Sequence, residues 1–213
     1  MRSWGLNYNK YVKCNLLKEG SFFILMFNSK FWEDTSELTT KVYICGYCNK
    51  EIATNSGYIT KRMNGVASDS IYICHNCNAP TYFRDDYEQY PGVKYGFNVG
   101  ALPSEIEIIY DEARSCYSVN AFTSTVMNCR KILMSIACNE GADEGKSFLE
   151  YINYLNDKGY IPPNGRQWVD KIRKLGNQAT HKLEMKNKED ANLALNFTGM
   201  LLKFIYELPK MLE

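Results

Sequence analysis

The sequence predicts an α+β protein in two parts: a small four-cysteine β module and, after it, an all-α antiparallel helical bundle. Two nearly identical stretches, each a short β run that leads into Cys-x-x-Cys, indicate the first part. Uninterrupted helical periodicity from Pro103 onward indicates the second. The composition, 45% hydrophobic and 23% charged over 213 residues, is that of a globular chain long enough to bury a sizeable core.

Residues 1–40 are expected to form an N-terminal arm. The stretch before Met26 has no clear hydrophobic period, and we interpret it as either an upstream extension or a loosely packed arm. Its apolar run Phe22–Phe27 is far shorter than the roughly 20 residues that span a bilayer, and no signal peptide is recognisable. The net charge of +1 gives no signature of a membrane or nucleic-acid partner. We therefore expect no membrane association and a cytoplasmic location.

Residues 41–84 are expected to form the β module. The stretches "KVYICGYC" and "SIYICHNC" each read as a strand entering a cysteine pair. Between them "SGYITKRM" reads as a middle strand, and "APTYF" follows the second pair as another. Their β-branched and aromatic residues favour strands. This repeat of a strand and a Cys-x-x-Cys knuckle is the outline of a zinc ribbon.

Cys45, Cys48, Cys74 and Cys77 are the predicted metal ligands. Zn²⁺ takes four thiolates in a tetrahedron, and two facing Cys-x-x-Cys knuckles supply them. The 25 residues between the pairs fit a hairpin that brings the second knuckle beside the first. Because four thiolates leave no open position, we expect the zinc to be structural; an iron–sulfur centre or a redox role are the alternatives. His75, inside the second knuckle, is interpreted as a surface or neighbouring side chain rather than a ligand.

Residues 85–102 are rich in tyrosine and glycine and have no period, so they are expected to form a connector whose aromatic side chains pack on one of the two parts. The charge differs weakly on either side of it. Residues 41–84 carry five Lys and Arg against two acids, a net of +3, while residues 103–213 carry fourteen against fifteen, a net of −1. A mildly basic β module is compatible with binding phosphates.

Residues 103–213 are expected to form five helices joined by short loops, which implies an antiparallel bundle. Capping residues at the starts and glycines at the ends set their limits. The predicted helices begin at Ser104 with Glu107 as a capping box, run from Asn120 to near Gly141, run from Ser147 to Gly159, cover 166–183, and begin again near Asn187.

The fourth helix carries a polar stripe in "RKLGNQATH". Arg173, Asn177 and His181 stand at i, i+4 and i+8, which leaves the first and last roughly 80° apart around the helix. RNA cleavage without a metal needs a base for the 2′-hydroxyl proton and a cation for the phosphate, and imidazole and guanidinium suit these tasks. The alternative is a polar contact between helices, with Arg173 paired to an acid such as Glu112.

Three segments, "YDEAR", "NCRKIL" with Arg130, and "RKLGNQATH", resemble the DUF4145 domain family. The resemblance covers roughly residues 41–208, and members often carry an N-terminal zinc ribbon of this kind. The family is similar to the HEPN superfamily of helical bundles, many of which are dimeric, metal-independent ribonucleases of toxin–antitoxin and antiphage systems. Their motif has fewer residues between its arginine and histidine than the seven that separate Arg173 from His181. The resemblance implies a HEPN-like homodimer, with Arg130 lining the same groove as the polar stripe.

Two functions follow as hypotheses. The first is a zinc-binding, non-catalytic module that binds RNA, DNA or a partner protein in phage–host conflict or restriction systems; it includes a regulatory subunit of a separate effector. The alternative is a metal-independent endoribonuclease that uses Arg173, Asn177 and His181. Other chemistries are disfavoured, because the chain has no glycine-rich phosphate loop and no Ser–His–Asp arrangement. Cys129 or Cys138 would need a nearby histidine to act as a nucleophile.

Overall fold

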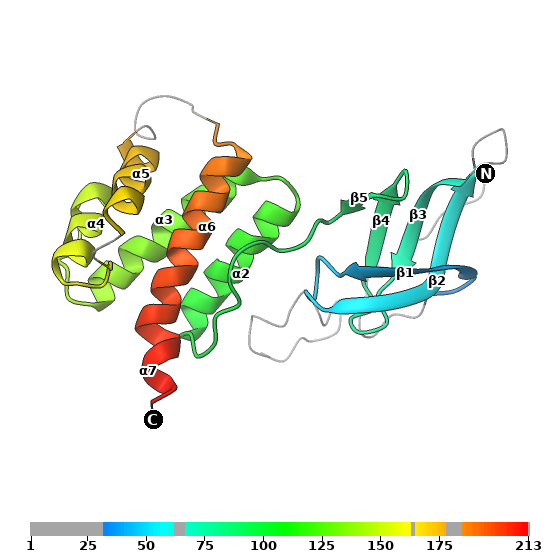
Figure 1. Ribbon diagram of the computed structural model, residues 1–213, viewed down its shortest axis with the longest axis horizontal. Coiled ribbons are helices and arrows are strands. Elements are labelled where there is room, and N and C mark those ends of the chain that lie inside the picture. Colours follow the sequence, from blue (N-terminus) through cyan, green and yellow to red (C-terminus); the bar gives the residue numbers. More distant parts are fainter. Residues whose placement is uncertain (1–31, 62–66, 163–164, 178–184, 213) are drawn as a thin grey trace, which may run out of the picture.

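The computed structural model describes residues 32–61, 67–162, 165–177 and 185–212. A five-stranded sheet and a helical body stand at opposite ends of the molecule, and an extended segment joins them (Figure 1). The predicted α+β class, with a small β module before the helices, is confirmed. None of the helices in the described ranges has both the length and the apolar character that a membrane crossing requires.

The sheet is an antiparallel meander in which each strand pairs with the next one along the chain. Its first strand begins within the expected N-terminal arm, and its last lies in the expected connector. The strands are β1 (Ser36–Ile44), β2 (Glu51–Lys61), β3 (Ala67–Ile73), β4 (Pro80–Arg84) and β5 (Glu88–Tyr90).

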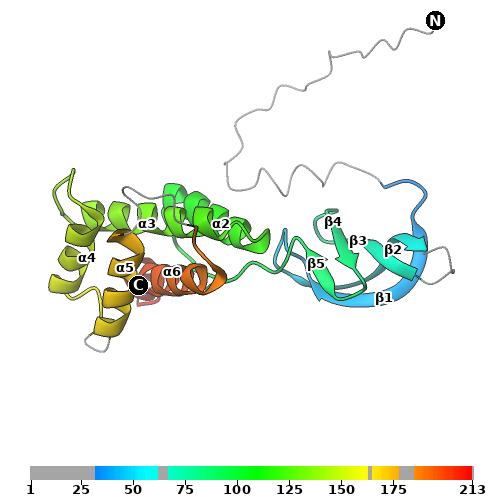
Figure 2. The ribbon, with the colours of Figure 1, turned by 90° about the horizontal axis from the view of Figure 1, so that it is seen from above.

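The sheet curls so that β1 and β2 close over one face of β3 and β4 (Figure 2). Gly57 permits the close approach of β2 to β3, because a Cβ at this position would overlap the carbonyl oxygen of Ile71. The Tyr72 hydroxyl donates a 2.9 Å hydrogen bond to the Thr39 carbonyl across the curl. The Tyr72 and Phe83 rings pack edge to face beneath it, with their centroids 5.8 Å apart. This small aromatic core lies directly beside the cysteines.

The helical body is built around α3, which packs against helices on three sides. The five predicted helices are all present, and the last continues through one π-helical turn, η3 (Lys203–Glu207), into the short α7 (Leu208–Lys210). The main helices are α2 (Ser104–Ser118), α3 (Phe122–Asn139), α4 (Phe148–Asp157), α5 (Arg166–Asn177) and α6 (Lys188–Leu202).

Of the two serine caps predicted at helix starts, one is confirmed and the other is wrong. Ser147 caps α4 as predicted. It also forms a capping box, since its Oγ accepts from the Glu150 N–H and the Glu150 carboxylate accepts from the Ser147 N–H at 2.8 Å. The box predicted at Ser104 is wrong. Pro103 is the cap residue of α2, and its carbonyl already accepts a 2.9 Å bond from the Glu107 N–H. Ser104 therefore lies inside the first turn, where its side chain makes no capping bond.

The connector is packed against the helical body, as its aromatic residues predicted. We call residues 92–100 the strap. The Tyr95 ring stacks on Tyr117 of α2 with centroids 4.9 Å apart, and its hydroxyl accepts a 2.9 Å bond from Asn196 of α6. The strap therefore runs along α2 and touches α6, which fixes the sheet at one end of the helical body.

Candidate functional site

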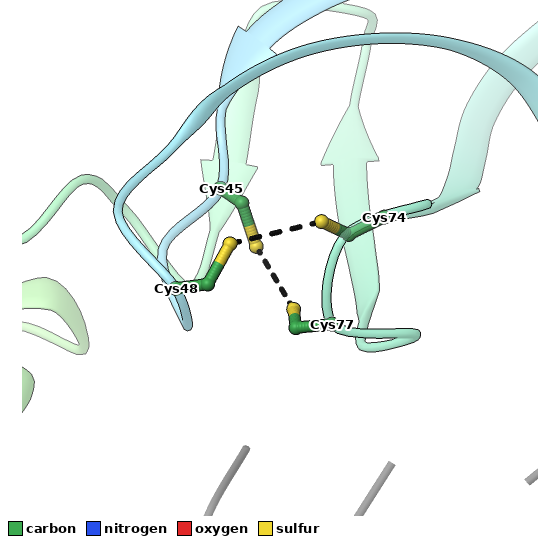
Figure 3. Close-up of side chains that lie close together, drawn as sticks. All are labelled: Cys45, Cys48, Cys74 and Cys77. Atoms are coloured by element: carbon green, nitrogen blue, oxygen red, sulfur yellow. Dashed lines mark hydrogen bonds between the residues drawn. The ribbon is translucent and has the colours of Figure 1, made fainter. Parts of the chain in front are cut away.

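The four predicted metal ligands come together at one end of the sheet (Figure 3). The Sγ atoms of Cys45, Cys48, Cys74 and Cys77 all lie within 4.8 Å of one another. Two pairs across the cluster, Cys45 with Cys77 and Cys48 with Cys74, are each 3.8 Å apart. These four residues could therefore bind one metal ion.

The two knuckles are built alike because their local sequences are alike, "CGYCNK" and "CHNCNA". In the first, the Cys45 N–H donates to the Lys50 carbonyl at 2.9 Å; in the second, the Cys74 N–H donates to the Ala79 carbonyl at 3.0 Å. Each asparagine that follows the second cysteine adopts the left-handed conformation with φ near 57°, which asparagine tolerates better than most residues. Sequence and backbone thus give two matching half-sites.

The distances across the cluster match the requirement of a tetrahedral metal–thiolate centre. With metal–sulfur bonds of about 2.3 Å, tetrahedral geometry places two sulfur atoms about 3.8 Å apart. The cluster is enclosed, since Cys45 and Cys74 have no exposed surface and Cys77 has 1%. Four thiolates would complete the shell of one ion and leave no position for a substrate.

His75 does not belong to this cluster, as the sequence indicated. It lies in the turn of the second knuckle and is exposed. The group of side chains that could hold a metal ion, as far as the described residues go, consists of the four cysteines. Tyr43, by contrast, is buried in the same cluster as three of the cysteines, and burial raises the pKa of its hydroxyl.

The polar stripe of the fourth helix is described only in part. Asn177 is the last residue of α5, while His181 lies outside the described residues. Arg173 is half-buried and engaged locally: its guanidinium pairs with Asp170 at 3.3 Å and donates to the Asn153 side chain on α4. The ribonuclease alternative therefore stays a prediction, with its arginine held between two helices.

Arg173 pairs with an acid, as the structural alternative expected, but the acid is Asp170 and not Glu112, which was the example given. Glu112 instead accepts a 3.1 Å hydrogen bond from Asn128, which ties α2 to α3. Arg173 finds its acid one helical turn away, at Asp170, because the i to i−3 spacing places them on one face of α5.

Arg130 presents a different environment on α3. Its guanidinium lies 4.7 Å from the centre of the Phe148 ring, at the start of α4, and its Nε is buried with no hydrogen-bond partner among the described residues. Burial lowers the pKa of this guanidinium. No contact among the described residues joins Arg130 to Arg173, so a shared groove between them stays a prediction.

The comparisons with known proteins address the helical body. Residues 111–212 match the family model described as "Domain of unknown function (DUF4145)". Over these residues the helical body is similar to the DUF4145 family. No curated protein and no solved structure matches the chain.

The "YDEAR" segment, which straddles the start of the matched DUF4145 region, has a function that the sequence did not reveal. Three of its side chains hold the strap: Tyr110 donates to the Phe97 carbonyl at 3.0 Å, Asp111 pairs with Lys94 at 2.8 Å, and Arg114 donates to the Tyr95 carbonyl at 3.0 Å. The only sequence signal was the dense polarity of a short run on one helix. Its targets lie 13 to 19 residues earlier in the chain, out of reach of helical periodicity.

The Cys129 thiol of the helical body is not placed for catalysis, whereas Cys138 is partly exposed. Cys129 is fully buried in the core, and burial raises its pKa to about 12. A thiol in this state is protonated at neutral pH and inert. This agrees with the low weight that the sequence gave to a cysteine nucleophile.

Proposed function

We propose that the chain is a zinc-stabilised, non-catalytic module that binds single-stranded nucleic acid through its sheet, with the DUF4145 domain as the body that holds the sheet. The observation that carries the proposal is the closed set of four cysteines, whose cross-cluster Sγ distances of 3.8 Å suit a tetrahedral ion. Two Cys-x-x-Cys knuckles on a small sheet are typical of structural zinc sites. The metal would supply folding energy rather than chemistry.

A row of four aromatic side chains and one isoleucine on the outer face of the sheet supports a binding role. In the strand register, Tyr58 lies opposite Ile71, Ile71 opposite Tyr82, and Tyr82 opposite Tyr90, so the four side chains share one face. Trp32 extends the row, with its ring 6.3 Å from that of Tyr58. We call these five residues the aromatic row. Such rows on sheets stack the bases of single strands.

One cationic side chain beside the aromatic row is placed to meet a phosphate. The Arg84 guanidinium lies 5.4 Å from the centre of the Tyr90 ring and 3.4 Å from the Glu88 carboxylate, and it is more than half exposed, so a phosphate could compete with Glu88 for it. Two carboxylates on this face are engaged by tyrosine hydroxyls: Asp69 accepts from Tyr82 at 2.8 Å and Glu88 from Tyr90 at 3.1 Å.

Binding is tested by fluorescence anisotropy with labelled single-stranded RNA, single-stranded DNA and a duplex of the same sequence. We expect binding to single strands, and a loss of about 10- to 100-fold in affinity for each of Tyr82→Ala and Tyr90→Ala, since stacking contributes roughly 1–3 kcal/mol per base. Tyr87→Ala is the matched control, because Tyr87 is 75% exposed in the turn before β5 and lies outside the aromatic row. Equal effects of all three, or no binding to any strand, would contradict the proposal and favour a protein partner.

The non-catalytic part is tested by incubating the full chain with mixed RNA in EDTA. We expect no cleavage by the wild type, by His181→Ala or by Arg173→Gln. Cleavage by the wild type that His181→Ala abolishes, with an unchanged melting temperature, would replace this proposal with the ribonuclease alternative. A metal assay on the same preparation tests the zinc claim separately from the non-catalytic claim, because cleavage and zinc content are measured independently.

A further inference from the structure

The two knuckles share their turn but differ in the residues between their cysteines. The first reads "CGYC" and the second "CHNC", so Gly46 stands in one where His75 stands in the other. The backbone of Gly46 lies outside the left-handed region, and its conformation does not require a glycine. Its surroundings do, because a Cβ at this position would lie 2.4 Å from the Gly92 carbonyl oxygen and 2.7 Å from that of Pro91. The glycine therefore permits a close approach between the first knuckle and the start of the strap.

Gly92, the first residue of the strap, contacts the knuckle and the helical body at the same time. Its carbonyl oxygen lies against Gly46, while its N–H donates to the Ser118 carbonyl at the end of α2, at 2.8 Å. A Cβ on Gly92 would lie 3.2 Å from that same Ser118 oxygen, so this side of the residue is also closely packed. A single residue thus joins the first knuckle to α2.

Two side-chain contacts lie on either side of this junction. The Gln89 side chain donates to the Ile44 carbonyl, directly before the first cysteine, at 2.8 Å and to the Pro91 carbonyl at 3.0 Å. The Asn49 side chain, directly after the second cysteine, donates to the Asn98 side chain of the strap at 3.5 Å. The contacts of the first knuckle with residues 89–98 are therefore made by neighbours of its two metal ligands. We call these contacts of Ile44, Gly46 and Asn49 the latch.

The second knuckle has different neighbours. Its Asn76 side chain accepts a 3.1 Å bond from Lys50 of the first knuckle, and its Asn78 carbonyl accepts a 2.9 Å bond from the Trp32 indole. His75, at the position equivalent to Gly46, is exposed. An ion bound by four cysteines takes two ligands from each knuckle and joins the two. It would therefore hold the first knuckle in the position in which the latch is made.

We infer that the four-cysteine site controls the latch: a bound metal ion fixes the sheet against the helical body through Gly46 and Gly92, and loss of the ion frees the sheet to move. Without an ion, no bond joins the two halves of the cluster, and thiolates within 4.8 Å of one another repel. The pair of Lys94 with Asp111 involves no knuckle residue, so the strap stays on the body. The inference rests on the metal-binding part of the proposed function and not on its nucleic-acid part.

Nuclear magnetic resonance relaxation of backbone amides measures whether the sheet and the body tumble as one unit. With one zinc per chain, we expect both parts to have the same rotational correlation time. After zinc is removed with EDTA, the helical amides should keep their chemical shifts while the sheet amides report a clearly shorter correlation time, and added Zn²⁺ should restore the common value. A metal-free chain that still tumbles as one unit would overturn the inference.

Metal analysis of each sample separates failure of the latch from failure of the zinc site. A zinc-loaded wild type whose two parts tumble independently would overturn the latch and leave the zinc site intact. A chain that takes up no zinc would overturn the zinc site and its control of the latch together.

Gly46→His separates the latch from the folding of the sheet, because it gives the first knuckle the residue that the second carries at the equivalent position. We expect this variant to keep one zinc and a folded sheet, while the sheet and the body tumble independently even in the zinc-loaded state. His75→Gly is the matched control and should tumble as one unit, since His75 lies outside the latch. Common tumbling of Gly46→His, or an equally loose sheet in His75→Gly, would contradict the latch.

A second variant covers the case in which Gly46→His loses its metal. The double variant Gln89→Ala/Asn98→Ala removes the side-chain hydrogen bonds of the latch and leaves every residue of both knuckles unchanged. We expect it to bind one zinc and to lose the common correlation time. A zinc-loaded double variant that tumbles as one unit would overturn the inference.

Discussion

The sheet and the helical body are held together by different means. In the sheet, three of the eight residues that form its buried cluster in the described part of the chain are metal-ligand cysteines, namely Cys45, Cys74 and Cys77. In the helical body, the buried cluster of the described residues contains twenty-three members and one cysteine, Cys129. We therefore expect the small sheet, with its few apolar side chains, to need a bound metal to fold, and the body to fold through apolar burial alone.

We therefore expect the sheet and the helical body to unfold independently, because different interactions stabilise them. Removal of the metal should act on the sheet, and truncation of apolar side chains should act on the body. The strap joins the two, since the Gln89 side chain donates to both the Ile44 and Pro91 carbonyls while Gly92 bonds to the end of α2. Four experiments test this expectation.

The largest effect is expected for Cys74→Ser. Loss of one thiolate from a four-thiolate site should remove the zinc and unfold the sheet, because structural zinc contributes roughly 10–16 kcal/mol of apparent binding free energy in small zinc domains. The helical content measured by circular dichroism should persist. Cys116→Ser is the matched control, because Cys116 lies in α2 outside the cluster and its loss should leave the metal content unchanged. Loss of the helices together with the metal would contradict two separate stabilities.

A truncation in the helical core should have the opposite pattern. Leu133→Ala removes a side chain that is 1% exposed in α3, and we expect the free energy of unfolding of the body to fall by about 2–5 kcal/mol. Zinc content at room temperature should not change. Met127→Ala in the same helix, where the side chain is 51% exposed, should change stability by less than about 0.5 kcal/mol.

The two regions should also respond to pH in opposite directions. Burial raises the pKa of Cys129 to about 12 and that of Tyr110 to about 12, so the folded body binds these protons more tightly than the unfolded chain. Their contribution to stability is therefore complete below the unfolded pKa values, about 8.5 and 10, and is lost as the pH rises toward 12. The zinc site should fail in acid instead, because its thiolates become protonated.

Thermal unfolding followed from pH 5 to 11, with metal release recorded by a chromogenic chelator, measures both trends. Cys129→Ala should reduce the alkaline slope even if it lowers stability overall. A sheet and a body that unfold together at both extremes of pH would show that the comparison is wrong.

The smallest effect is expected at the helix starts. Ser147→Ala should destabilise the body by about 1 kcal/mol, since it removes the side-chain bond to the Glu150 N–H. Ser104→Ala should cost much less, because Ser104 makes no capping bond at the start of α2. Chemical denaturation of the two variants side by side measures the difference. Equal losses would mean that Ser104 caps its helix in solution.

The sequence allowed the features that depend on local spacing to be predicted. The two knuckles follow from the Cys-x-x-Cys spacing and zinc chemistry, and the Ser147 cap follows from a serine that directly precedes a helical run. The same pattern at Ser104 failed, because the preceding Pro103 carbonyl takes the first helical bond. A local pattern thus predicts well until a neighbouring residue competes for the same backbone group.

Features that depend on distant pairing were out of reach of the sequence. The hold of "YDEAR" on the strap joins residues that no periodicity relates, and Gly100 meets Glu207 across 107 positions. The aromatic row needs the register of four strands, which alternation within one strand does not fix. The bond from Arg173 to Asn153 needs the packing of α5 on α4. Each became visible only once the elements were placed in space.

The most direct test is X-ray absorption spectroscopy at the zinc edge, with total metal analysis, on the full chain purified without added metal. We expect one zinc per chain, surrounded by four sulfur atoms at about 2.3 Å. A preparation that is folded in the sheet yet contains no zinc, or a zinc with oxygen or nitrogen among its nearest neighbours, would contradict it.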